Sequence, residues 1–123
     1  MSRLFLIIGS IAAGLAVMAG AFGAHGLEGR VTPDRLETFK TGVAYQMYHA
    51  LALLLVGWMG MQQSATLLTS AGVAFALGIL IFSGSLYVLV LTDTAWLGAI
   101  TPIGGVAFIT GWGLLVAHLL RTA

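Results

Sequence analysis

The sequence contains no charged residue between Thr41 and Thr92, and its only strongly polar break in that interval is Gln62-Gln63-Ser64. Only 7% of the 123 residues are charged, whereas 59% are hydrophobic and the mean hydropathy is +1.04. A soluble domain is about 25% charged, so this chain cannot cover a water-facing surface. The composition therefore predicts an integral membrane protein.

The few charges divide the chain into four uncharged stretches. A transmembrane helix needs about 20 apolar residues, and the apolar residues here run continuously, without the alternation of a barrel strand. The sequence therefore predicts an all-α membrane protein, a four-helix bundle in one integral membrane domain over residues 1–123. The predicted spans are 4–26, 42–61, 66–91 and 102–120. The first stretch also resembles a signal peptide, but it is longer than a typical signal core, so we expect it to be retained.

Six of the nine charges lie between Glu28 and Lys40. Thr32 suits a helix N-cap, Pro33 its first position and Asp34 its first turn. We therefore expect a short amphipathic helix at the membrane interface between spans one and two. This loop holds three basic residues, and the opposite side holds Arg3 and Arg121 with the amino terminus. The numbers of positive charges on the two sides are therefore nearly equal, and the positive-inside rule does not determine the orientation.

Small residues recur at every fourth position of the first span, where they permit close approach of a neighbouring helix. These residues are Ala12, Ala16, Gly20 and Ala24. Packing within the chain is the simpler interpretation of this stripe, and contact between copies of the chain is the alternative.

Polar side chains within the spans gather in one half of the membrane, beneath the charged loop. Intramembrane polar groups are costly and therefore mark either helix-to-helix contacts or a functional site. The candidate cluster consists of His25, Tyr45, Gln46, His49, Ser83, Ser85 and Tyr87. Hydrogen bonding between helices and a cavity for a ligand or proton path both remain open.

Signatures of enzymes, metal sites and nucleic-acid binding are missing from the sequence. It contains no HExxH, GxSxG or GxxxxGK[ST] motif and no cysteine, so we expect no catalytic residue, no cofactor and no metal. The net charge is only +1 and the sequence has no run of basic residues, so we expect no positively charged surface that binds nucleic acid.

Several segments together resemble the domain-of-unknown-function 423 family of small bacterial inner-membrane proteins, to which a small eukaryotic transmembrane protein looks related. They are GAFGAHGL at 20–27, TGVAYQMYHALAL at 41–53, FSGSLY at 82–87, TPIGG at 101–105 and Gly111-Trp112. The resemblance implies four spans in the bacterial plasma membrane and no assigned activity. It also implies cytoplasmic termini, a topology that rests on basic residues in the second loop and the tail, whereas this chain has Gln62-Gln63-Ser64 in that loop and only Arg121 in its tail.

Three functions are compatible with these features. The first is binding of a small molecule or lipid by the polar cluster. The second is a structural or accessory role, in which the 28–40 segment or the small-residue stripe contacts a membrane-protein partner or a second copy. The third is a lipid-acting enzyme with His49 as general base. In all three cases the protein is in contact with the lipid bilayer.

Overall fold

A computed structural model describes residues 1–122, with the side chain of Ala24 left out, and these residues are almost entirely helical without any strand. Four of their helical segments are long and apolar enough to cross a membrane, as predicted. The segments are Ser2–Leu27, Pro33–Gln62, Thr66–Thr92 and Ala95–Thr122. Each includes one predicted span and extends beyond it.

Three of the four segments change their helical pitch along the way. The first consists of α1 (Ser2–Met18), the π-helical turn η1 (Ala19–Gly23) and α2 (Ala24–Leu27). The third consists of α4 (Thr66–Gly78), the π-helical turn η2 (Ile79–Ser83) and α5 (Gly84–Thr92). The fourth begins with the 3-10 turn η3 (Ala95–Ala99) and continues as α6 (Thr101–Thr122). The second is the single helix α3 (Pro33–Gln62).

The start of α3 agrees with the sequence prediction. The side chain of Thr32 accepts a hydrogen bond from the backbone N–H of Arg35, Pro33 occupies the first position, and Asp34 lies in the first turn. The helix then continues without a break to Gln62, so the amphipathic segment is the first part of the second membrane helix and not a separate element. Its apolar face continues directly into the span because Phe39 is already buried.

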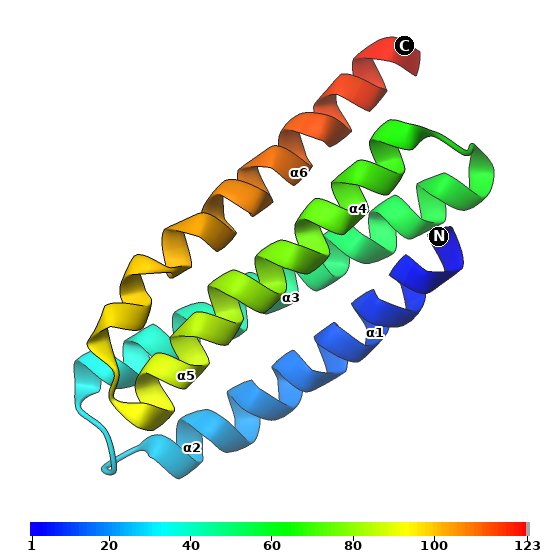
Figure 1. The fold of residues 1–123 in the computed structure, drawn as a ribbon. Coiled ribbons are helices and arrows are strands. Elements are labelled where there is room, and N and C mark those ends of the chain that lie inside the picture. Colours follow the sequence, from blue (N-terminus) through cyan, green and yellow to red (C-terminus); the bar gives the residue numbers. More distant parts are fainter. Residues whose placement is uncertain (123) are drawn as a thin grey trace.

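The four segments form an open row and not a closed square. α1 packs mainly on α3, α3 also packs on α4, and α4 packs on α6. As a result α1 and α6 lie on opposite sides of the central helices (Figure 1). Both termini and the 63–65 connection lie at one end, whereas the 28–32 and 93–94 connections lie at the other (Figure 1).

The small residues of the first segment face α3. Ala12 and Ala16 are buried, and Gly20 lies close enough to Val43 that an added Cβ would be 3.4 Å from its Cγ1. This part of the stripe therefore serves packing within the chain. The fourth predicted member, Ala24, lies outside the described side chains.

Aromatic rings and glycines provide much of the remaining helix contact. Four phenylalanine rings each lie against a glycine of another segment: Phe5 on Gly72, Phe39 on Gly23, Phe75 on Gly111 and Phe108 on Gly78. Each glycine leaves space for a ring where any side chain would collide with it, which lets the helix backbones approach closely. The main apolar core contains three of these rings.

Candidate functional site

The polar residues predicted to form one cluster are divided among separate contacts. Gln46 and Tyr87 are joined to each other, His49 and Tyr45 lie among aromatic rings, and Ser83 and Ser85 make contacts of their own. His25 is exposed on α2, and no described hydrogen bond links it to the other six. The arrangement therefore has to be considered contact by contact.

Gln46 links three helical segments. Its amide nitrogen donates to the carbonyl oxygen of Ala12 in α1 at 2.8 Å, and its amide oxygen accepts from the hydroxyl of Tyr87 in α5 at 2.6 Å. The Gln46 side chain is buried, so both bonds form where water cannot compete with them. Gln46 thus connects α3 to the two segments on either side of it.

His49 uses both ring nitrogens within the protein. The indole Nε1–H of Trp112 donates to His49 Nε2 at 3.1 Å, and His49 Nδ1 lies 2.8 Å from the carbonyl oxygen of Tyr45. Because an indole N–H can only donate, Nε2 is the acceptor and Nδ1 carries the proton. The ring is also stacked on Phe108, with centroids 3.5 Å apart. In this arrangement neither nitrogen is available to take a proton from a substrate.

The two serines join neighbouring segments. The hydroxyl of Ser83 donates to the carbonyl oxygen of Gly42 at 2.7 Å, which links η2 to α3. The hydroxyl of Ser85 lies 2.6 Å from that of Thr101, which links α5 to α6. Both contacts are hydrogen bonds between helical segments. Such bonds were one of the two explanations of the polar cluster that the sequence left open.

A groove lies between the first and third segments, with the Gln46–Tyr87 pair at its wall. Its volume is about 410 Å³, which is within the range of small-molecule sites, about 300–1,000 Å³. The lining comprises Ile8, Ile11, Ala12, Leu15, Gln46, Ala76, Ile79, Leu80, Gly84 and Tyr87. Apart from the glutamine and the tyrosine it is apolar, and Ile11, Leu15 and Leu80 are exposed along it.

The groove follows from the way in which α1 is held. α1 packs along α3, where an added Cβ on Gly9 would lie 2.9 Å from the carbonyl oxygen of Ala50. It meets α4 through the ring of Phe5 on Gly72. Gly84 on the opposite wall faces open space, because an added Cβ would meet no atom within 4 Å.

A family description, "Protein of unknown function (DUF423)", matches residues 19–105 of this chain. The chain belongs to this family. It is 50% identical over 120 residues to the UPF0382 membrane protein YwdK of Bacillus subtilis, covering 97% of this chain and 98% of that protein. It is 49% identical to the UPF0382 membrane protein SAB0533 of Staphylococcus aureus, covering 98% of both chains. No solved structure matches the chain.

Membership of the DUF423 family confirms the resemblance stated above, and the relatives are membrane proteins of bacteria, as predicted. Neither the family description nor the relatives' names refer to a ligand, a reaction or a partner. Within the described residues no three His, Asp or Glu side chains come together in a way that could hold a metal ion.

Sequence reasoning missed Trp112 as the partner of His49. The available signal was its position, because a tryptophan in the middle of a predicted span must find an acceptor for its N–H, whereas one at the span end can use interfacial water. Sequence reasoning also missed the backbone acceptors Ala12 and Gly42, which no side-chain pattern reveals.

Proposed function

We propose that this DUF423 protein binds a membrane lipid, with an acyl chain of the lipid in the groove between its first and third segments. The observation that carries the proposal is the groove itself, with a volume of about 410 Å³, an apolar lining and two linked polar side chains. Its exposed rim of Ile11, Leu15 and Leu80 opens sideways, in the direction from which a chain in the bilayer would enter.

The polar pair at the wall of the groove supports an amphipathic ligand. The amide of Gln46 has two N–H groups, one of which donates to Ala12, and the Tyr87 hydroxyl oxygen retains acceptor capacity while its hydrogen points to Gln46. A carbonyl or hydroxyl near the upper part of a lipid chain has suitable partners in this pair. A purely apolar cavity would lack them.

Contact of a partner with the small-residue stripe has less support. Ala12 and Ala16 are already buried between α1 and α3, so this part of the stripe is not free for another protein. The groove, in contrast, is open space on the membrane side of the bundle.

The proposed location is the bacterial plasma membrane, with both termini in the cytoplasm. The placement of the termini rests on the family resemblance, because the loop end carries Arg30, Arg35 and Lys40 and the terminal end carries Arg3 and Arg121 with the amino terminus. Counting Lys and Arg by the positive-inside rule does not decide between the two orientations, and nearby acidic residues contribute little to that rule.

Filling the groove tests the proposal. Gly84→Leu adds a side chain directly into open space, and Gly84 has ordinary helical angles (φ −59°, ψ −45°), so the helix tolerates the change. Gly113→Leu is the matched control, because Gly113 also has no atom within 4 Å of an added Cβ and lies on α6, away from the groove.

The measurement is native mass spectrometry of the purified protein in detergent, supplied with equal amounts of dioleoyl phosphatidylethanolamine and dioleoyl phosphatidylglycerol. We expect Gly84→Leu to lower the fraction of protein carrying a lipid severalfold and Gly113→Leu to leave it unchanged. Equal lipid occupancy in the two variants would contradict the proposal.

A further inference from the structure

A second cavity lies at the loop end of the bundle, between the start of α3 and the end of α5. Its volume is about 700 Å³, again within the range of small-molecule sites. Its lining consists of Arg30, Val31, Thr32, Asp34, Arg35, Thr38, Val90, Leu91 and Asp93. We call it the charged cleft. The 28–32 and 93–94 connections, which contribute to its lining, lie at one end of the membrane helices (Figure 1), the level at which lipid headgroups meet a membrane protein.

The charged cleft carries charges of both signs in equal number. Arg30 and Arg35 contribute two positive charges, and Asp34 and Asp93 contribute two negative charges. A cleft with this balance is suited to a ligand that has a positive and a negative group of its own, because each end of the ligand finds the opposite charge. A ligand with a negative group alone would offer the carboxylates of the cleft no positive partner.

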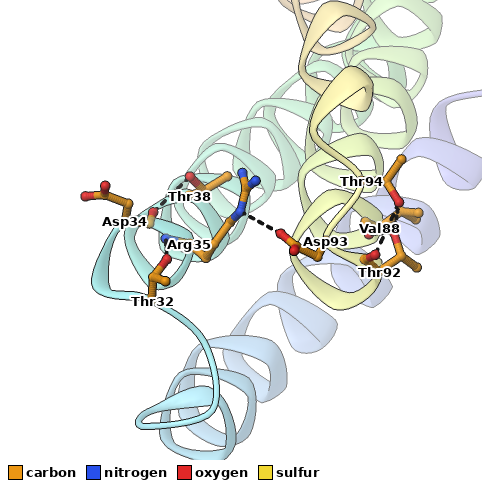
Figure 2. Close-up of polar contacts among 8 residues, drawn as sticks. All are labelled: Thr32, Asp34, Arg35, Thr38, Val88, Thr92, Asp93 and Thr94. Carbon is orange, nitrogen blue, oxygen red and sulfur yellow. Dashed lines mark hydrogen bonds and ion pairs between the residues drawn. The ribbon is translucent and has the colours of Figure 1, made fainter.

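Arg35 has most of its hydrogen-bonding capacity available. Only its Nε–H is directed to Asp93, with a distance of 3.3 Å to Oδ1, and Figure 2 shows the two terminal nitrogens pointing away from that carboxylate. A guanidinium has five N–H donors and binds phosphate oxygens in pairs. The ion pair with Asp93 therefore orients Arg35 and leaves it free to bind an anionic group.

Asp93 is held in a defined position by the turn that follows α5. Its φ of 50° is in the left-handed region, and the hydroxyls of Thr92 and Thr94 on either side lie 2.6 Å apart (Figure 2). Thr92 also donates to the carbonyl oxygen of Val88. The turn therefore fixes the backbone at position 93, and the largely exposed Asp93 carboxylate is directed at Arg35.

On each of two helices, one residue of the charged cleft lies on the helix face that lines the groove. In the third segment Leu80, Gly84 and Tyr87 line the groove and Leu91 lines the charged cleft, at spacings of four, three and four residues. Such spacings keep residues on one helix face. In α3, Gln46 in the groove and Arg35 in the cleft are eleven residues apart, about three turns and about 16 Å along the axis.

We propose that the charged cleft holds a zwitterionic lipid headgroup, an ammonium and a phosphate, while the acyl chain of the same lipid lies in the groove. The arginines donate to the phosphate, and the carboxylate of Asp93 accepts from the ammonium, whereas the carboxylate of Asp34 points away from the Arg35–Asp93 pair (Figure 2). This inference rests on the proposed function of the groove and names the lipid class. Chains of different lipids are equally apolar, so the selectivity for one lipid has to come from the headgroup.

The test is the ratio of the two lipids bound from the equal mixture of phosphatidylethanolamine and phosphatidylglycerol described above. The test variant combines Asp34→Asn with Asp93→Asn. Asparagine tolerates both the first helical turn and the left-handed backbone of position 93, so the fold is kept. The control combines Glu28→Gln with Glu37→Gln, which removes the same two charges from the same end of the protein but outside the cleft lining.

We expect the natural chain to prefer the phosphatidylethanolamine. The double aspartate variant should shift the ratio toward the phosphatidylglycerol by about threefold to fivefold, which is the size of effect that an ionic contact at an exposed site can have. The glutamate control should shift it less.

The two proposals fail in different ways. If Gly84→Leu lowers lipid binding while the natural chain shows no headgroup preference, or both double variants shift the ratio equally, the headgroup assignment is overturned and the groove is retained. If Gly84→Leu leaves binding unchanged while the aspartate variant shifts the ratio, the chain does not lie in the groove, and the combined site is overturned.

Discussion

Trp112 and His49 form the only described side-chain hydrogen bond between α3 and α6, in a layer otherwise made of rings. The histidine can be buried there because both of its nitrogens have partners, one from the indole and one from a backbone carbonyl. At the scale of single residues, the polar groups of this protein thus serve first to hold helices together.

Trp112→Phe removes the indole donor and leaves His49 Nε2 without it. We expect a loss of about 1 kcal/mol in the free energy of unfolding, because the cost of an orphaned buried acceptor is partly offset by new partners in the unfolded state. The free energy of unfolding is measured by circular dichroism during titration with a denaturing detergent in mixed micelles. Trp58→Phe is the control, since Trp58 is 59% exposed. If His49→Phe combined with Trp112→Phe costs the full sum of the single changes, the two residues are not coupled.

As a functional site the predicted polar cluster stays a prediction, and the structure shows which hydrogen bonds its members make. Gln46, His49, Ser83, Ser85 and Tyr87 all make hydrogen bonds, as their cost in a membrane requires. Which of them meet depends on the rotation of each helix, and a sequence pattern does not determine that rotation when the partner is a backbone carbonyl or a single indole N–H.

At the scale of helical elements, glycine and phenylalanine act as pairs. Phe75 is fully buried and its ring lies against Gly111 of α6, where an added Cβ would be 2.6 Å from the ring atom Cε1. Since a fully buried ring has no space into which to move, the pair determines how closely α4 and α6 approach.

Gly111→Ala should therefore destabilise the protein by about 1–3 kcal/mol through overpacking. Gly113→Ala, two positions further along the same helix, adds its methyl group to open space and should stabilise the helix by about 0.5–1 kcal/mol. Equilibrium unfolding in mixed micelles compares the two. Equal effects of the two changes would show that the Phe75 contact does not limit the approach of the helices.

Helix positions were predictable because charge is excluded from the bilayer, and this restriction places Glu28, Asp93 and Arg121 outside the spans. The two π-helical turns were not predictable. η2 contributes Ile79 and Leu80 to the groove, and its sequence Ile79–Ser83 contains no proline or other break that distinguishes it from regular helix. η2 packs on α6 and α3, and these contacts are not encoded in the local sequence.

At the scale of the whole molecule, the open row of helices creates the groove. A closed square of four helices would bring α1 against two neighbours along its length, whereas here its main partner is α3 alone. Because α1 has one full neighbour, its other side remains open to the membrane between Ile11 and Leu80. The same row puts the charged cleft at one end and both termini at the other (Figure 1).

The orientation of this row determines which leaflet supplies the headgroup for the charged cleft. Because the chain contains no cysteine, single cysteines at exposed positions of the two ends report the orientation without background. With cytoplasmic termini, Glu28→Cys reacts with a membrane-impermeant maleimide on intact cells, whereas Ser64→Cys reacts only after the membrane is opened. Labelling both variants in opened membranes provides the control for reactivity. The reverse pattern would turn the charged cleft toward the cytoplasm and make the inner leaflet the source of its lipid.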